Sequence, residues 1–150
     1  MRFLLVITFL LDVAMKIWVR QLPASAGRFA FWSPAGPIGI VPSVNAVLAF
    51  SLPIPNAWIW PIGWIVVAVL VGALGRISNL KSQISNPHSA ALLAIILGAI
   101  SNLTDRTFLG GVTDYLSFTS LFPAFNVADL LILGGIIGWM RSTRSSVDVS

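Results

Sequence analysis

The sequence contains no cysteine, no glutamate and only one histidine, His88. Without cysteine the chain can form no disulfide and has no thiolate to act as nucleophile or metal ligand. A single histidine is also too few for the usual zinc ligand sets, so we expect no metal site. The acidic residues are five aspartates, and any acid–base chemistry must rest on them.

Charge is scarce as well. Charged residues make up 9% of the chain and hydrophobic residues 57%, and the mean hydropathy is +0.91. A soluble domain usually has about 25% charged residues, so this composition indicates a membrane protein. The net charge of +4 does not indicate nucleic-acid binding. Lysines and arginines occur in ones and twos between apolar runs, whereas a nucleic acid requires a clustered basic face.

Four apolar runs predict four transmembrane helices, because a span needs about 20 residues. We expect an all-α membrane protein, a four-helix transmembrane bundle with a small extracytoplasmic loop region that contains β-structure. The 150 residues should form a single integral membrane domain. The expected helices cover approximately residues 3–20, 57–75, 88–105 and 125–141, and residues 142–150 should form a polar tail.

The first run resembles a signal peptide, because small residues follow it at 24–26. Asp12, Lys16 and Arg20 interrupt the region before those residues, so we interpret the run as a retained first helix. Residues 21–55 are rich in Pro, Gly, Ser and Trp and indicate an outer loop, with short strands near 29–32 and 39–44.

Basic residues favour one orientation of the bundle. Cytoplasmic loops carry an excess of Lys and Arg, which would place both termini and the loop between the second and third helices in the cytoplasm. The basic residues on that side are Arg2, Arg76, Lys81, Arg141 and Arg144, and those toward the outside are Lys16, Arg20, Arg28 and Arg106.

Polar residues from three predicted helices fall at a similar depth. With a rise of about 1.5 Å per residue, Asp12, Asn102 and Asp129 lie roughly 14–20 Å from the cytoplasmic ends of their helices. Lys16 shares a helix face with Asp12 at i, i+4, and Asn126 shares one with Asp129 at i, i+3. Charged groups that face lipid are costly, so these faces should point into the bundle and mark a functional site.

Each polar pair also has a purely structural interpretation. Asp12 and Lys16 can be a structural ion pair, and Asp105 with Arg106 can be a pair that snorkels to the interface. Asn126 can be the N-cap of the last helix. Together these interpretations require several polar groups to converge without a function.

The available residues limit the chemistry. His88 lies at the cytoplasmic start of the third helix, away from the polar layer formed by the residues at the depth of Asp12, Asn102 and Asp129. A Ser-His-Asp triad is therefore not available. Lys16 could serve as the base for Ser51 or Ser101, but Asp12 one turn away would keep it protonated. The remaining candidate for a catalytic site is a pair of aspartate carboxylates.

Asp114 and Asp129 flank the connection into the fourth helix and can meet at the membrane rim. Two neighbouring carboxyls share a proton. The ionised member can take a proton from water, and the protonated member can polarise a scissile carbonyl.

Three motifs in the second half of the chain resemble those of signal peptidase II, the lipoprotein signal peptidase family. Residues 101–106 (SNLTDR) resemble its G-N-x-x-D-R box, and residues 110–115 (GGVTDY) resemble its G-x-V-x-D-[FY] box. Residues 122–129 (FPAFNVAD) match its F-P-x-F-N-x-A-D box in full. Order and spacing also agree, and together these boxes are specific.

The first half resembles the family more loosely. Residues 12–16 (DVAMK) keep the ends of the D-Q-x-[ST]-K box, and residues 45–51 (NAVLAFS) resemble N-x-G-A-A-F-S. Val47 and Ser101 each stand where the family pattern has glycine.

The resemblance implies that Asp114 and Asp129 are a catalytic pair and that no metal or cofactor is needed. It also implies that the enzyme cleaves bacterial prolipoproteins just before a diacylglyceryl-modified cysteine, at the outer face of the inner membrane. The implied partners are this lipidated substrate and membrane lipid, with no nucleic acid, and we expect a monomer. The implied supporting residues are Asn102, Arg106, Asn126, Asn45, Asp12 and Lys16.

A different class of function uses the same residues. A small membrane protein without enzymatic activity could use buried aspartates as a proton or ion relay, or as part of a lipid-binding site.

Overall fold

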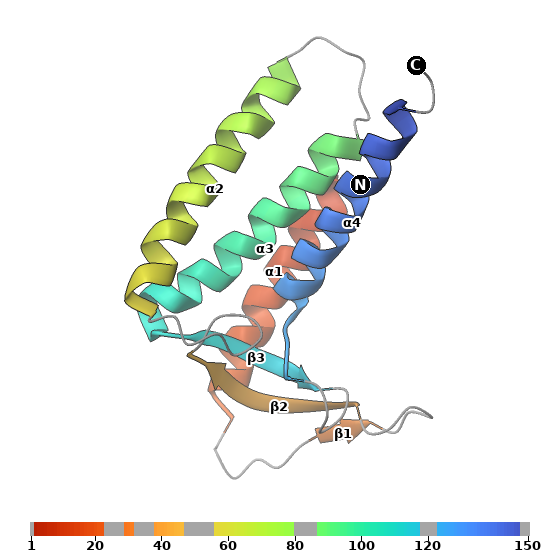
Figure 1. Ribbon diagram of the computed structural model, residues 1–150. Helices are drawn as coiled ribbons and strands as arrows, with labels where there is room; N and C mark the ends of the chain where they lie inside the picture. Colours follow the sequence, from red (N-terminus) through yellow and green to blue (C-terminus); the bar gives the residue numbers. More distant parts are fainter. Residues whose placement is uncertain are drawn as a thin grey trace.

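The computed structural model describes residues 2–22, 29–31, 38–46, 56–79, 87–117 and 123–147. Within these ranges the helices are α1 (Arg2–Arg20), α2 (Asn56–Asn79), α3 (Pro87–Leu109) and α4 (Val127–Val147). The strands are β1 (Phe29–Phe31), β2 (Ile38–Asn45) and β3 (Val112–Ser117). In Figure 1 the sheet lies across one end of the helices, and α1 begins and α4 ends at the opposite end.

The predicted strands near 29–32 and 39–44 are confirmed as β1 and β2. Residues 112–117 belong to the expected connection into the fourth helix, but they form β3, the third strand of an antiparallel sheet with the order β1-β2-β3. The prediction of a polar tail is wrong for residues 142–147, because α4 continues to Val147. Ser142 and Thr143 each donate a hydrogen bond to the Trp139 carbonyl, which lets polar residues continue the helix.

The helices are apolar outside and polar inside. On α1 the buried residues are Asp12, Lys16 and Val19, whereas Phe3 and Leu4 are 76% and 63% exposed. This is the reverse of a water-soluble helix and suits lipid as the solvent. Of the described helices, Ala57–Ile77 in α2 and the whole of α3 are long and apolar enough to cross a membrane. The count of four spans stays a prediction.

α3 is the centre of the bundle and contacts each of the other helices. Its closest approach is to α4, at Gly98. A Cβ atom there would lie 2.5 Å from the Ala128 carbonyl oxygen and 2.7 Å from Cγ1 of Ile132. Small residues allow membrane helices to pack with their backbones in contact, and here they fix the first turn of α4 against α3.

The chain turns sharply from α3 into the sheet. α3 ends at Leu109, and Gly110 follows with φ of +75°, the left-handed conformation that commonly terminates helices. β3 then pairs with β2, with Asp114 opposite Ser43. A bridge between Leu116 and Phe125 joins β3 to the residues just before α4. The sheet thereby holds Asp114 beside the start of α4.

Candidate active site

Asp129 is held by the first turn of its own helix. The Asn126 side-chain oxygen accepts a hydrogen bond from the Asp129 backbone N–H at 2.9 Å, and the Asp129 carboxylate accepts one from the Asn126 N–H at 3.1 Å. This reciprocal pair is a capping box, with Asn126 as N-cap and Asp129 at N3. It fixes the Asp129 side chain and places a carboxylate at the positive end of the helix.

Asp114 lies on β3 and is 4% exposed. The Asn126 side-chain amide donates a hydrogen bond of 2.7 Å to its carboxyl group, and Asn45 on β2 also hydrogen-bonds to it. Burial, followed by the nearby charge of Asp129, raises the pKa of Asp114 to about 6. The two hydrogen bonds and the charge of Lys16 oppose this rise.

The two aspartates of the expected pair are thus brought into one site by Asn126. Its backbone N–H holds Asp129 and its side-chain amide holds Asp114. Arg106, at the end of α3, is buried and lies close enough to both carboxylates to interact with them electrostatically. The expected residues Asn45, Arg106 and Asn126 therefore all surround the carboxyl pair.

Asn102 joins the pair to α1. Its side-chain amide donates to the second oxygen of Asp129 at 2.8 Å, and its side-chain oxygen accepts from the Lys16 ammonium at 2.8 Å. Lys16 is 2% exposed and also lies 3.1 Å from the Asp12 carboxylate. The ion pair between Asp12 and Lys16 that the i, i+4 spacing predicts is confirmed.

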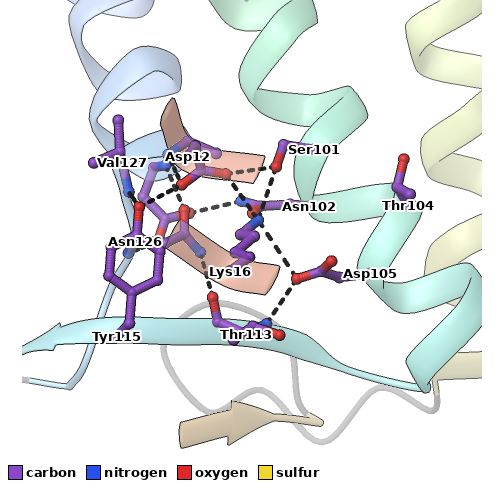
Figure 2. A network of polar contacts seen from close by, with 12 residues as sticks. Asp12, Lys16, Ser101, Asn102, Thr104, Asp105, Thr113, Tyr115, Asn126 and Val127 are labelled. Carbon is purple, nitrogen blue, oxygen red and sulfur yellow. Dashed lines mark hydrogen bonds and ion pairs between the residues drawn. The ribbon is translucent and has the colours of Figure 1, made fainter. Parts of the chain in front are cut away.

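Asp12 has no exposed surface and accepts four interactions (Figure 2). One oxygen receives the Ser101 hydroxyl at 2.6 Å and the Lys16 ammonium. The other receives the Tyr115 hydroxyl at 2.8 Å and the Ala128 backbone N–H at 3.0 Å. Burial and the charge of Asp12 raise the pKa of the Tyr115 phenol. Asp12 therefore acts as a cap for α4 supplied by α1.

Asp105 has partners other than its neighbour Arg106. Its carboxylate pairs with Arg20 and lies 3.5 Å from Lys16, and it accepts the Thr113 backbone N–H at 2.9 Å. Asp105 and Arg106 are 5% and 7% exposed. The interpretation of these two residues as a pair that snorkels to the interface is wrong, because both are buried within the polar layer.

Ser101 and Lys16 are in contact, at 2.9 Å, which is the geometry that a Ser–Lys catalytic pair requires. The hydrogen bonds oppose that function. Ser101 donates its proton to Asp12, and Lys16 is a donor to Ser101 and Asn102 and is paired with Asp12. Ser101 is also only 3% exposed, so it is neither deprotonated nor accessible.

Five residues of the polar layer were not among the expected site residues: Ser101, Asp105, Tyr115, Arg20 and Thr113. Ser101 lies four residues before Asp105 on one helix face, and Arg20 lies four residues after Lys16. These spacings were signals for both residues. Thr113 and Tyr115 have no such helical spacing, and only the match of residues 110–115 to the family box pointed to them.

His88 lies far along α3 from this layer and contacts Trp139 edge to face, with ring centroids 5.1 Å apart. Within the part of the chain that the structure describes, no group of three or more metal-ligating side chains is positioned to hold an ion.

Comparisons with known proteins agree on one family. The family model described as signal peptidase (SPase) II matches residues 4–143. The lipoprotein signal peptidase of Maridesulfovibrio salexigens is 32% identical over 147 residues, which cover 91% of this chain and 90% of that protein. The enzyme of the same name from Clostridioides difficile is 30% identical, with 91% and 90% covered. The match to the Chlamydia pneumoniae relative, at 33% identity, covers 75% of this chain and 64% of that protein.

The fold is also found among solved structures. A bacterial membrane enzyme determined by the in meso method at 2.3 Å superposes with a TM-score of 0.78, at 20% identity, over 97% of this chain and 88% of that one. A second such enzyme, determined at 1.9 Å, gives a TM-score of 0.73 at 21% identity, with 95% and 91% covered.

Proposed function

The chain belongs to the signal peptidase II family, and we propose that it is the endopeptidase that removes signal peptides from bacterial prolipoproteins. Relatives named lipoprotein signal peptidase match nine-tenths of the chain, which supports the same reaction here. We further propose that the peptide is cut just before the diacylglyceryl-modified cysteine, as the resemblance of the boxes implies. The rival function as a relay or lipid-binding protein is less favoured, because it does not account for the family match.

Hydrolysis by an aspartic mechanism is the chemistry that the polar layer supports best. The observation that carries it is the bridge through Asn126, whose backbone N–H binds one carboxyl and whose side chain binds the other. Two carboxyls in one site cannot both ionise readily, so the pair shares a proton and titrates as a unit.

The charges of the layer also favour one shared proton. Lys16, Arg20 and Arg106 face four aspartates, so a single proton on the carboxyl pair leaves the layer neutral. Five of these seven groups are buried, and burial of net charge in a medium of low dielectric constant is costly, which favours this state. The four aspartates are Asp12, Asp105, Asp114 and Asp129.

The surroundings assign a role to each member of the pair. Asp129 receives the Asn126 N–H and the Asn102 amide at a helix N-terminus, all of which stabilise a carboxylate. The raised pKa of Asp114, about 6, favours its acid form. Asp129 therefore takes a proton from the attacking water, while Asp114 donates a hydrogen bond to the scissile carbonyl oxygen.

The later steps follow from this charge state. Water oxygen bonds to the carbonyl carbon, and the carbonyl oxygen takes the Asp114 proton, which gives a neutral diol. Its collapse breaks the C–N bond, while Asp129 passes its proton to the leaving nitrogen and Asp114 recovers the hydroxyl proton. The pair returns to its starting state, and no cofactor is consumed.

We propose that all four helices span the bacterial inner membrane, with the site toward its outer face. A signal peptide is itself a membrane helix, and its cleavage point emerges at the outer interface. The polar layer lies at the end of the bundle where the sheet is found, away from the start of α1 and the end of α4 (Figures 1 and 2). This arrangement would place both termini in the cytoplasm.

Asparagine substitution tests the catalytic pair. We expect Asp114→Asn and Asp129→Asn each to abolish cleavage of a lipidated precursor by purified protein, because Asn can neither take nor supply the proton. Asp148→Asn is the matched control, since it makes the same change at a residue that belongs to none of the motif boxes. Near-normal turnover by either site variant would refute the aspartic mechanism, and an inactive wild-type protein would refute the peptidase function.

A second substitution separates the aspartic mechanism from a Ser–Lys mechanism. Ser101→Ala should retain cleavage if the aspartates are catalytic and lose it entirely if Ser101 is the nucleophile.

The orientation is tested with single cysteines, for which this cysteine-free chain provides a clean background. Cysteines introduced at Asn79 and Ser33 can be treated with an impermeant thiol reagent in intact cells. We expect labelling at position 33 only. Labelling at position 79 only would invert the proposed orientation.

A further inference from the structure

We propose that Ser101 is a positioning residue for Asp129, acting through the Lys16 ammonium and the Asn102 amide. The proposal rests on the peptidase function given above and adds a residue to its machinery. Ser101 does not touch the carboxyl pair. It lies one residue before Asn102, on the turn of α3 that faces Asp12 and Lys16 (Figure 2).

Ser101 connects the two members of the ion pair. Its hydroxyl donates to Asp12 at 2.6 Å and accepts from Lys16 at 2.9 Å. The hydroxyl therefore uses its one proton and one lone pair in fixed directions. Because both charged partners come from α1, this hydroxyl sets how α1 docks against α3 at the depth of the site.

Ser101 also completes the coordination of Lys16. The ammonium has three N–H bonds, and its three near acceptors are Ser101 at 2.9 Å, Asn102 at 2.8 Å and Asp12 at 3.1 Å. Each proton has its own acceptor, so the proton directed at Asn102 is fixed by the other two. Lys16 and Ser101 are 2% and 3% exposed, so solvent does not compete for these positions.

The Lys16 contact sets the orientation of the Asn102 side chain. An amide can present either its oxygen or its nitrogen to a neighbour. The ammonium selects the oxygen, at 2.8 Å, which leaves the nitrogen to donate to Asp129 at 2.8 Å. With the orientation reversed, the amide oxygen would face the carboxylate and repel it.

Loss of the Ser101 hydroxyl should therefore affect Asp129 through two intervening side chains, Lys16 and Asn102. The ammonium would lose one acceptor and move toward Asp12 and Asp105, the latter already 3.5 Å away. Its hold on the Asn102 oxygen would weaken, and the amide would no longer be held in the orientation that serves Asp129. Substrate binding would be unaffected, because Ser101 is 3% exposed and its hydroxyl is engaged by Asp12 and Lys16.

Kinetics test this inference. We expect Ser101→Ala to lower kcat by about five- to tenfold with KM within about twofold, since an interaction that positions the base acts on the chemical step. Ser101→Thr keeps the hydroxyl and should restore kcat. Ser101→Cys keeps the volume with a weaker hydrogen-bonding group and should lie between the two. The cysteine variant also keeps the test decisive if the alanine variant does not fold.

Ser89→Ala provides the matched control. Ser89 is on the same helix, is 2% exposed and also hydrogen-bonds to a cation of α1, accepting from Arg2 at 2.9 Å. It lies at the end of α3 remote from the site. A general loss of α1–α3 docking would affect both variants alike. Equal kcat in Ser101→Ala and wild type, or equal losses in both alanine variants, would overturn the proposal.

A spectroscopic measurement keeps this inference separate from the peptidase function. Selective 15N labelling of asparagine gives side-chain amide signals from six residues, and the Asn102 signal is assigned by its loss in Asn102→Asp. We expect it to move in Ser101→Ala and to stay in place in Ser89→Ala. An unmoved Asn102 signal refutes the role of Ser101 even in an active enzyme, and a moved signal supports it even if no precursor is cleaved.

Discussion

Helices α1 and α2 both pack against α3, but α1 does so through buried polar side chains and α2 through apolar ones. The α1 contacts run from Lys16 to Ser101 and Asn102, and from Asp12 to Ser101. The α2 contacts centre on a cluster in which Val67 meets Leu92, Ile96 and Leu103 of α3. A single described side-chain hydrogen bond, from Trp64 to Thr107, accompanies that cluster.

The difference shows what each kind of contact can specify in a membrane. The free energy of an apolar side chain is nearly the same in lipid as in the protein interior. α2 is therefore held by close packing, which imposes little directional constraint. Hydrogen bonds and ion pairs have fixed lengths and directions. α1 therefore sets the geometry of the site, whereas α2 supports the outer side of α3.

The largest effect on stability is expected from breaking the polar contact of α1. Asp12→Ala removes the nearer of the two carboxylates that pair with the buried Lys16 and leaves Asp105 at 3.5 Å. Removal of one partner of a buried pair costs about 3–5 kcal/mol. Asp12→Ala combined with Lys16→Ala should recover part of this loss. Recovery is incomplete because Ser101, Tyr115 and the Ala128 N–H still lack their acceptor.

A double-mutant cycle on melting temperature in detergent measures this coupling. Additive losses would show that Asp12 and Lys16 do not interact. An Asp12→Ala protein with full stability and no activity would make Asp12 part of the chemistry and not a support for it.

The second-largest loss of stability is expected from a change at the contact between α3 and α4. Gly98→Ala places a methyl group against the Ala128 carbonyl, and overpacking of this kind costs about 1–3 kcal/mol. We also expect activity to fall, because the first turn of α4 carries Asp129. Gly134→Ala is the control, since nothing lies within 4 Å of its added Cβ. Equal melting temperatures for the two variants would show that the close approach at Gly98 is not required.

In the apolar contact between α2 and α3, Leu92→Ala should lower the free energy of unfolding by about 2 kcal/mol, near the lower end of the range for a buried leucine. In lipid the transfer free energy of the lost methyl groups contributes little, so the loss comes mainly from the cavity. Turnover per folded molecule should stay unchanged. Leu92 is 4% exposed, so the test concerns a buried side chain comparable to Ser101. A fall in kcat would contradict the view that apolar contacts of α3 do not set the site geometry.

The smallest expected effect on stability, that of Asp114→Asn, is a gain and not a loss. The pKa of Asp114 is raised from 3.8 to about 6, so the folded protein binds more protons than the unfolded chain between these values and loses stability as pH rises through them. Asp114→Asn removes this cost, which is about 3 kcal/mol for the full shift, but the new side chain has one acceptor oxygen for the two donors Asn45 and Asn126. We therefore expect a net stabilisation of about 1–2 kcal/mol at pH 8 and no gain near pH 4. Melting temperatures at both pH values decide it. A destabilised variant at pH 8 would mean that the ionised carboxyl is stabilising.

Local spacing predicted much of this molecule. Apolar runs placed the four helices to within a few residues, except at the end of α4. The i, i+4 spacing of Asp12 and Lys16 predicted their ion pair, and the i, i+3 spacing of Asn126 and Asp129 predicted a helix cap. These features depend on residues that lie within one helical turn.

Contacts between segments that are distant in the sequence could not be predicted from local spacing. Asp105 was considered with its neighbour Arg106, but adjacent residues on a helix point in different directions, and its partner is Arg20 on another helix. β3 was missed although Val112, Thr113 and Tyr115 favour strands, because the segment is short and its pairing partner β2 is distant in the sequence. Tyr115 was matched only as the last residue of a family box, and its contacts with Asp12 and the Val127 N–H were not predicted.

The polar face of α1 has a consequence for how the protein is made. Ser101, Tyr115 and Ala128, which complete the environment of Asp12, lie 89, 103 and 116 residues later in the chain. At a synthesis rate of about 5–20 residues per second, α1 waits roughly 5–20 seconds for them. If α1 spans the membrane as proposed, Asp12 and Lys16 have during that interval mainly each other, one turn apart, to offset the cost of two ions in lipid. The ion pair between Asp12 and Lys16 would therefore stabilise α1 in the nascent chain as well as in the finished enzyme.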